Sequence, residues 1–123
     1  MSTTPDPIRI AIKMMFNAID HEEWMVLEAL LHPQTEFQVN NFVPFRGRDA
    51  VMNFYRNLRG MKKGEHLIET VAVEGNNGAC WGRFTGTRLD GSEISVMFAQ
   101  VLTFEDKKVK RRREYHCIPK LGG

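Results

Sequence analysis

Proton-transferring residues are concentrated in the last predicted strand of this 123-residue chain, which runs from Lys108 to Cys117. A half-buried strand normally alternates apolar with polar residues, whereas this one carries charge on both faces. One charged face must therefore point at a polar pocket, a polyanion or a partner. Within the strand, Glu114 is the best candidate for a general acid or base. His116 could share the proton work or orient Glu114, although a histidine at a strand end is more often simply solvated.

Two interpretations of Glu114 stay open at this point. A carboxylate beside Phe98 and Trp81 would be partly desolvated, which raises its pKa toward the range of a general acid or base. A salt bridge to Arg83 or Arg112 would instead lower the pKa and keep the carboxylate ionised. The first interpretation gives the residue a catalytic role, and the second gives it a structural one.

Amide and guanidinium groups could hold and polarise a ligand. Gln38 and Gln100 could donate hydrogen bonds to a substrate carbonyl or enolate, or could satisfy each other as buried amides. Arg83 and Arg112 could clamp a carboxylate or phenolate, or could balance nearby acids. Aromatic residues are expected to form the wall of the pocket and the core; they are Trp81, Phe98, Phe16 and Tyr55.

Helical periodicity predicts the elements at the start of the chain. Asp6 and Pro7 form an N-cap and first-turn pair for a helix that reaches about residue 19. Asp20 and Glu23 have the spacing of a capping box, which begins a second helix that Pro33 ends.

The rest of the chain predicts one more helix and mostly strands. A short strand is expected at 35–40 and a third helix at 47–59. From His66 onward, three β-turn signals separate four β-rich runs, and His66 itself, like His21 and His32, is expected at the surface. The turn signals are Gly75-Asn76-Asn77-Gly78, Asp90-Gly91 and Glu105-Asp106-Lys107.

Turn lengths predict which side chains share a face of the sheet. A two-residue turn at Asp90-Gly91 places Trp81 and Arg83 on the same face as Phe98 and Gln100. A three-residue turn at residues 105–107 adds Arg112, Glu114 and His116 to that face, whereas a two-residue turn would slip the last strand by one residue and remove Glu114. The opposite face is apolar at its centre and is expected to bind a second copy of the chain; it would contain Cys80, Gly82, Phe84, Met97, Ala99, Val101, Arg111, Arg113 and Tyr115.

The order of elements, together with FNAIDHEEWMVLEALLHPQTEF, PFRGRDAVMNFY, GRFTGT and VLTFEDKKVKRRREY, resembles the SnoaL-like (polyketide cyclase and ketosteroid isomerase-like) branch of the nuclear transport factor 2-like superfamily. The resemblance implies an α+β fold, in which three N-terminal helices pack on the concave face of a cone-shaped, curved antiparallel sheet and enclose a pocket. It covers nearly the whole chain and implies a single domain over residues 1–123, with residues 1–6 and 119–123 as flexible tails.

The same resemblance leaves the reaction open, because a fold hosts many functions. Glu114 matches the acidic position that the family carries on its last strand. None of the three catalytic groups of ketosteroid isomerase is present at the aligned positions, which are Gln38, Gln100 and Ile12. The arginine and aspartate pair of the epoxide hydrolases falls at about Thr85 and Thr87.

Composition narrows the class of protein. A net charge of +2 and a charged content of 26% do not indicate a polyanion binder. No apolar run approaches the ~18 residues of a membrane span, and two cysteines without a CxxC spacing indicate a reducing, cytoplasmic location without a metal site. No cofactor motif is present.

Three functions remain. The first is a cofactor-independent isomerase, cyclase or dehydratase that acts on a hydrophobic polycyclic, polyketide-like or terpenoid-like molecule in biosynthesis. The alternative is a non-catalytic module of the same fold that binds a small molecule or a protein. Nucleic-acid binding through the basic strand is disfavoured, because pleating divides the basic run between two faces.

Overall fold

The computed structural model describes residues 6–116, so the expected tails at 1–6 and 119–123 lie outside the described residues except for Asp6, which is the N-cap of the first helix. Helix α1 (Pro7–Asp20) begins as predicted, because the Asp6 carboxylate accepts a hydrogen bond of 2.8 Å from the backbone N–H of Ile8. Its buried stripe contains Ile12, Met15 and Phe16 and packs against the sheet.

The second helix differs from the prediction at both ends. Asp20 is the last residue of α1 and does not cap α2 (Trp24–Leu30), whose first turn receives no side-chain hydrogen bond. The carboxylate of Asp20 is bound to His66 instead. Pro33 lies inside strand β1 (Leu31–Val39), so the chain turns from helix to strand before it.

The third helix has two parts. Helix α3 (Arg48–Asn53) continues into a π-helical turn, η1 (Phe54–Leu58), which places Tyr55 inward. π-Helical turns are rare and often occur at functional sites.

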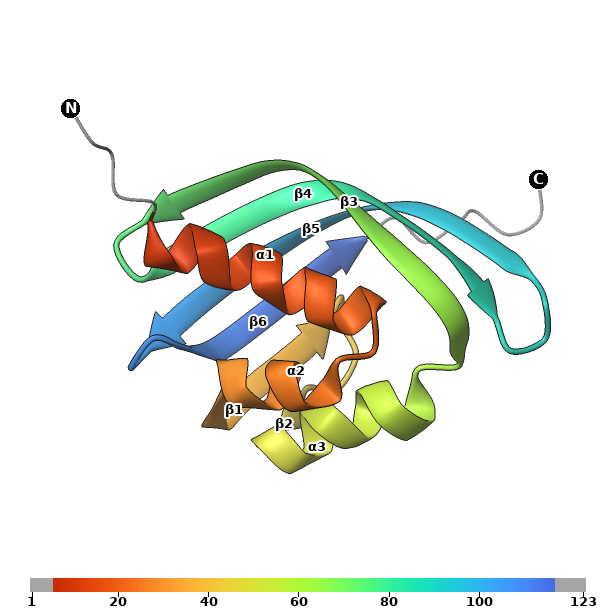
Figure 1. Ribbon diagram of the computed structural model, residues 1–123, viewed down its shortest axis with the longest axis horizontal. Helices are drawn as coiled ribbons and strands as arrows, with labels where there is room; N and C mark the ends of the chain where they lie inside the picture. The colour runs from red at the N-terminus through yellow and green to blue at the C-terminus, as the bar shows by residue number, and fades with distance from the viewer. Residues whose placement is uncertain (1–5, 117–123) are drawn as a thin grey trace.

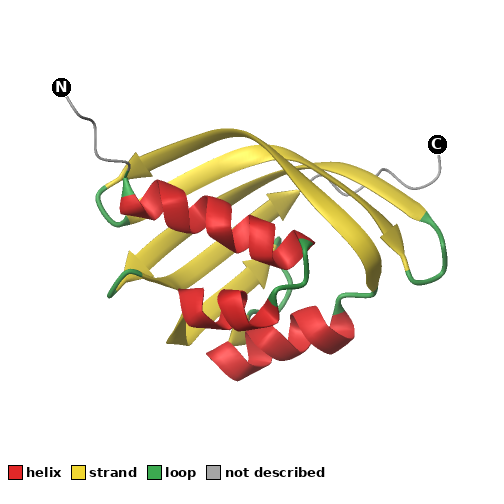
Figure 2. Ribbon diagram, viewed as in Figure 1, coloured by secondary structure: helices red, strands yellow, loops and turns green. Residues whose placement is uncertain are grey.

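Six strands form one curved sheet over the helices (Figure 1). The strands after β1 are β2 (Phe45–Arg46), β3 (Met61–Glu74), β4 (Asn77–Arg88), β5 (Glu93–Glu105) and β6 (Lys108–His116). Their order is β2-β1-β6-β5-β4-β3, and all neighbours are antiparallel except β1 and β6, which are parallel. The expected α+β plan is confirmed: the helices lie on one side of the sheet (Figure 2), although the sheet is mixed rather than purely antiparallel.

The register between β4 and β5 is one residue away from the prediction. Cys80 lies opposite Gln100, and Gly82 lies opposite Phe98. The connecting loop has three residues, because the backbone N–H of Arg88 donates to the carbonyl of Ser92. Gly91, at φ 89°, supplies the left-handed residue that such a loop requires.

This shift exchanges the two faces of β4, so Cys80, expected on the convex face, is buried on the concave side opposite Gln100. Trp81 and Arg83, expected in the pocket, lie on the convex face, opposite Ala99 and Met97. Phe84, expected on the convex face, is buried on the concave face instead.

Two departures from the prediction cancel in the last hairpin. The turn between β5 and β6 has two residues, Asp106 and Lys107, instead of three. A β-bulge follows, because Thr103 pairs with Arg111 and Phe104 pairs with Val109, which leaves Lys110 without a partner in the ladder.

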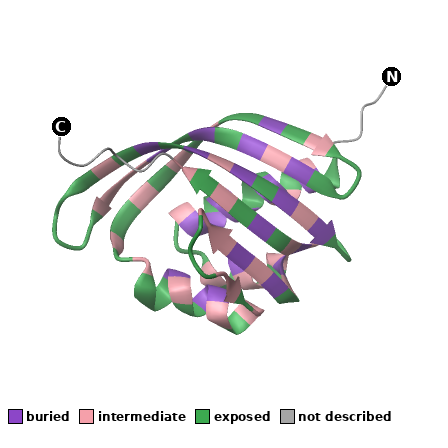
Figure 3. Ribbon diagram, turned by 180° about the vertical axis from the view of Figure 1, so that it is seen from behind, coloured by how far each residue is buried: buried purple, intermediate pink, exposed green. Residues whose placement is uncertain are grey.

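The bulge restores the alternation that the short turn would have reversed. Glu114 lies opposite Gln100, and His116 lies opposite Phe98. The predicted face for Arg112, Glu114 and His116 is therefore correct, although their partners are two residues from those expected. Seen from behind the sheet, buried and exposed residues alternate along β5 and β6 (Figure 3).

Candidate functional site

The concave side of the sheet encloses a cavity of about 220 Å³. Most of its wall is apolar, with aromatic side chains from β1, η1, β4 and β5. Five lining residues can donate or accept hydrogen bonds through their side chains; they are Tyr55, Arg59, His66, Glu114 and His116. An apolar cavity with a few polar groups is typical of a small-molecule site.

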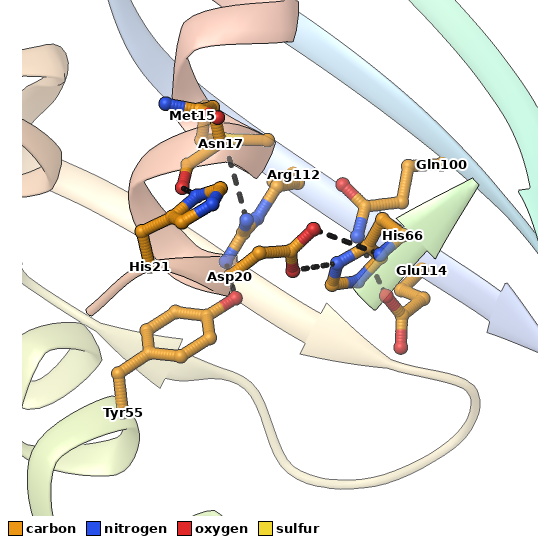
Figure 4. Close-up of polar contacts among 9 residues, drawn as sticks. All are labelled: Met15, Asn17, Asp20, His21, Tyr55, His66, Gln100, Arg112 and Glu114. Carbon is orange, nitrogen blue, oxygen red and sulfur yellow. Dashed lines mark hydrogen bonds and ion pairs between the residues drawn. The ribbon is translucent and has the colours of Figure 1, made fainter. Parts of the chain in front are cut away.

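Glu114 is held from two sides. Its Oε1 accepts a hydrogen bond of 2.6 Å from the amide of Gln100, and its Oε2 lies 3.2 Å from Nδ1 of His116 (Figure 4 shows Glu114 and Gln100). Burial raises the pKa of Glu114, but the hydrogen bonds from His116 and Gln100 and the charge of Arg112 outweigh it and hold the pKa below its ordinary value of 4.5. Glu114 is therefore an ionised carboxylate, as the salt-bridge interpretation expected, although the imidazole of His116 is its ionic partner.

His116 is the complementary half of this pair. The hydrogen bond to Glu114 raises the pKa of His116 above 6.5, against the opposing effect of burial. The backbone N–H of His116 donates to the Asn40 side chain at 3.1 Å, which joins the end of β6 to the end of β1.

A second dyad, absent from the sequence prediction, lies on the other wall. Asp20 accepts two hydrogen bonds from His66, one from the backbone N–H at 2.8 Å and one from ring Nδ1 at 2.6 Å (Figure 4). A carboxylate only accepts hydrogen bonds, so the proton of the imidazole is fixed on Nδ1 and Nε2 is left as the atom that can bind a ligand. The ring of His66 packs against Phe16 and Phe84, each with a centroid distance of 4.7 Å.

The sequence contained a weak signal for this dyad. Gly64, His66 and Ile68 alternate with more exposed residues, which places His66 on the inner face of β3. The signal was lost because the strand was expected to begin at His66, whereas it begins at Met61. Asp20 could not be paired with His66 from the sequence, because 46 residues separate them.

Arg112 forms the floor beneath the cavity. The residue is 1% exposed, and its guanidinium donates to the hydroxyl of Tyr55 and to the sulfur of Met15 at 3.3 Å (Figure 4). Its Cζ lies 3.9 Å from the ring centroid of Phe37. No carboxylate among residues 6–116 lies within salt-bridge distance of it. The expectation that Arg112 lies on the pocket side is correct, but Tyr55 and Phe37 separate it from a ligand.

Three further candidates lie outside the cavity. Gln38 is on the opposite face of β1 from Phe37 and Val39, and its amide donates to the carbonyl of Phe42 at 3.1 Å. Arg83 donates to Ser95 at 3.0 Å on the convex face. Trp81 is 42% exposed there. The roles expected for Gln38, Arg83 and Trp81 in the site are therefore wrong, and strand alternation is the reason in each case.

The remaining candidates lie in or next to the cavity wall. Tyr55 and Phe98 line it as expected. Phe16 is buried behind His66 and Phe98. Gln100 is buried, and its side-chain amide donates a hydrogen bond to Glu114. The oxygen of the same side-chain amide has no hydrogen-bond partner among the described residues.

The other two histidines lie away from the cavity. His21 is exposed and its ring contacts the backbone carbonyl of Asn17 at 2.9 Å. The imidazole of His32 approaches the carboxylates of Glu105 and Asp106 at the β5–β6 turn. That group is largely exposed, and no metal assignment follows from it.

A family model described as a SnoaL-like domain matches residues 12–112. No curated protein matches the chain. No helix in the described part of the chain is long and apolar enough to cross a membrane.

Solved structures with the same fold are similar over most of the chain, at low sequence identity. An NTF2-like protein of unknown function from Burkholderia pseudomallei has a TM-score of 0.82 and 14% identity, covering 89% of this chain and 90% of its own. A candidate SnoaL-like polyketide cyclase from Jannaschia sp. has a TM-score of 0.81 and 19% identity, with 94% and 90% covered. An epoxide hydrolase from M. tuberculosis has a TM-score of 0.82 and 16% identity, with 90% and 83% covered.

Proposed function

We propose that this chain, which belongs to the SnoaL-like domain family, is a cofactor-independent acid/base enzyme, an isomerase, cyclase or dehydratase, for a hydrophobic polycyclic, polyketide-like or terpenoid-like molecule. One observation carries the proposal: the carboxylate of Glu114 and the aspartate-oriented imidazole of His66 line the same largely apolar cavity. The cavity is smaller than the ~300–1,000 Å³ common for ligand pockets, so it would enclose the reacting end of a larger substrate.

His66 is the oriented proton acceptor in this proposal. Asp20 holds the proton on Nδ1, which leaves the lone pair of Nε2 available to a substrate, as in other sites where a carboxylate orients a histidine base. Aromatic neighbours on both sides fix the plane of the ring. Geometry of this kind keeps a base in position without rearrangement.

A solvent-facing groove beside His66 supports its role as the proton acceptor. His66 and Asp20 also line a groove between α1 and β3 on the other side of the dyad. A proton taken from a substrate in the cavity could pass to solvent on that side.

Glu114 and His116 are proposed as a second pair of groups that exchange protons with the substrate. Glu114 has a lowered pKa and can accept a proton or stabilise a developing positive charge, while the raised pKa of His116 favours its protonated form, which can return a proton. Two titratable groups whose pKa values are moved apart are typical of an acid and base pair.

Proton exchange tests the proposal without knowledge of the natural substrate. A panel of small cyclic enones, polyketide fragments and terpenoid ketones would be incubated with the protein in D₂O, and deuterium incorporation and conversion would be followed by mass spectrometry. We expect incorporation into at least one compound and a loss of about 10²-fold or more in His66→Gln and Glu114→Gln.

The matched control is His21→Gln, since His21 is an exposed histidine one residue from Asp20. It should keep the activity. Full turnover by both His66→Gln and Glu114→Gln would remove the catalytic roles assigned here.

The low pKa of Glu114 favours a second candidate, a non-catalytic binding module. A carboxylate held in an ion pair is a weak base, and the catalytic groups of ketosteroid isomerase are absent from the aligned positions. Under this alternative, a compound from the panel would bind tightly and be recovered unchanged and without deuterium.

A cytoplasmic location is part of the proposal. Cys80 is a free, buried thiol, as expected for a protein kept in a reducing compartment.

A further inference from the structure

Arg112 is a buried cation, and no carboxylate within residues 6–116 lies at salt-bridge distance from it. Its side chain is almost completely enclosed, and its recorded contacts are the hydroxyl of Tyr55, the sulfur of Met15 and the ring of Phe37. Enclosing a guanidinium whose direct contacts are neutral is costly, since the more distant carboxylate of Glu114 offsets only part of the desolvation. Such a charge is expected where an anion arrives from outside.

A second guanidinium, that of Arg59, also lies close to Tyr55. Arg59 lines the cavity, and its Cζ is 5.6 Å from the ring centroid of Tyr55 and 5.3 Å from that of Phe84. Within residues 6–116, Arg59 has no carboxylate at salt-bridge distance either. Two guanidinium groups therefore lie close to the ring of Tyr55, since Cζ of Arg112 is 5.4 Å from its centroid.

The hydroxyl of Tyr55 is arranged to donate. It accepts a hydrogen bond from Arg112, and no acceptor for its own proton is found in the described part of the chain. Burial raises the pKa of Tyr55, against the opposing effects of Arg112 and Arg59, so the phenol stays protonated. A donated bond from a hydroxyl that itself accepts from a cation is strengthened by that charge.

The charged groups around the cavity differ in how they are paired. Arg59 and Arg112 have no carboxylate at salt-bridge distance within residues 6–116, whereas the carboxylates of Glu114 and Asp20 are each paired with a histidine. Glu114 is already engaged by His116 and Gln100. The two guanidinium groups favour a ligand that brings a negative oxygen.

We propose that the cavity binds a small ring compound through one anionic oxygen, a phenolate or enolate, which accepts a hydrogen bond from Tyr55 and contacts the guanidinium of Arg59. Arg112 does not touch this ligand and acts through Tyr55 as a positioning residue. The inference deepens the proposed function by naming the substrate class, because removal of a proton beside a carbonyl produces an enolate oxygen. It rests on different residues from those that move the proton.

A chromophoric phenol tests the site directly. 4-Nitrophenol absorbs in the visible only as the phenolate, so the protein would be titrated into it at a pH one unit below its pKa in water. We expect the phenolate band to grow as the complex forms, because the site stabilises the anion. The pKa of the bound phenol should fall by about one unit or more, which corresponds to about a tenfold preference for the phenolate.

Three variants identify the groups responsible. Tyr55→Phe should weaken phenolate binding about tenfold or more, since it removes a charge-assisted hydrogen bond. Arg59→Gln should weaken phenolate binding while leaving neutral phenol binding nearly unchanged. Arg112→Lys keeps a positive charge but lacks the planar guanidinium that donates to Tyr55. The growth of the phenolate band should therefore be smaller in this variant also.

Arg111→Gln is the matched control, because Arg111 lies on the same strand and is exposed outside the cavity. It should leave the phenolate band unchanged. Circular dichroism would verify that each variant is folded; if Arg112→Lys is not, Tyr55→Phe and Arg59→Gln still decide the question.

The results separate this inference from the proposed function. Binding of 4-nitrophenol as the neutral phenol, no binding at millimolar concentration, or equal weakening by Arg111→Gln would overturn the anionic site. A phenolate that binds as expected to a protein that exchanges no protons with any compound would support the anionic site and contradict the enzyme.

Discussion

Glu114 and His116 are separated by one residue on β6 and stabilise each other's charged forms. The folded protein lowers the pKa of Glu114 below 4.5 and raises the pKa of His116 above 6.5. The stabilising effect of Glu114 is present above its unfolded pKa and is lost as the pH falls through the lower folded value. The stabilising effect of His116 is present below the pKa that His116 has in the unfolded chain. It is lost as the pH rises through the higher pKa that His116 has in the folded protein.

The pair should therefore stabilise the fold most between about pH 4.5 and 6.5. We expect the difference in the free energy of unfolding between the native protein and His116→Gln to be largest in that window and to shrink on both sides. Urea denaturation at a series of pH values measures it. A difference that is independent of pH would contradict the ion pair.

Cys80 should be inert in the folded protein. Burial raises the pKa of its thiol to about 12, so roughly 10⁻⁴ of it is ionised at pH 8. In a Cys117→Ser background, a thiol reagent at pH 8 should label Cys80 only after unfolding, and the labelling rate should rise steeply with urea. Rapid labelling without denaturant would contradict the burial of this residue.

At the scale of single residues, the sequence predicted those site residues whose position follows from helix or strand periodicity. Glu114, His116, Arg112 and Tyr55 were expected around the pocket and line it or lie directly beneath it. The pairing of Asp20 with His66 depends on how α1 crosses the sheet, which no local pattern encodes. The capping-box spacing of Asp20 indicated a competing local role that the structure does not use.

At the scale of elements, helix periodicity predicted the helices well, while strand register failed wherever turn length had to be guessed. The β4–β5 loop is one residue longer than expected, and the β5–β6 turn is one residue shorter. A single-residue error exchanges the two faces of a strand, which is why Trp81 and Arg83 were misplaced. The bulge at Lys110 preserved the predicted face of β6, and the sequence gives no distinct signal for that bulge.

The β5–β6 turn contains avoidable strain. Asp106 and Lys107 both have positive φ, 52° and 62°, in a two-residue turn where glycine is preferred at the second position. Lys107→Gly should raise the free energy of unfolding by about 1 kcal/mol, since it removes the cost of a left-handed lysine. Lys108→Gly, in the adjacent strand, should lower it, and a loss of stability in Lys107→Gly measured by urea denaturation would contradict the turn geometry.

Gly82 permits the irregular pairing of β3 with β4. A Cβ at this position would lie 1.9 Å from the carbonyl oxygen of Leu67, next to the register shift between Ile68 and Thr70. Gly82→Ala should therefore lower the free energy of unfolding by about 3 kcal/mol.

Gly47→Ala controls for backbone strain alone, because Gly47 has a φ of 91° and nothing lies within 4 Å of an added methyl. It should lower the free energy of unfolding by only about 1 kcal/mol in the same urea denaturation. A Gly82→Ala loss no larger than this would contradict the close approach of β3.

At the scale of the whole molecule, the convex face of the sheet exposes several large hydrophobic side chains beside the exposed Arg83 and Arg113. Large hydrophobic side chains on it are 42–52% exposed; they are Leu67, Trp81, Met97, Val101 and Tyr115. Exposed large hydrophobic side chains on one sheet face favour association with a second copy. Phe84, expected to contribute, does not, because it lines the cavity.

We expect a homodimer through this face. Light scattering at micromolar concentration should give twice the chain mass of 14.2 kDa, and Met97→Glu should reduce it to the monomer without loss of secondary structure. Leu89→Glu, in the exposed β4–β5 loop, should leave the mass unchanged. A native protein that scatters as a monomer would contradict the dimer.

The place of β6 in the sheet has a consequence for how the chain acquires its site. β6 is last in the sequence but lies in the middle of the sheet, between β1 and β5, and the parallel partner β1 precedes it by more than 65 residues. Pairing of such distant segments is slow, because the chain entropy must be lost before the contact forms. During synthesis, the β2-β1 pair and the β3-β4-β5 meander have no shared hydrogen bonds until β6 arrives. Since β6 also carries Arg112, Glu114 and His116, the step that completes the fold is the same step that creates the binding site.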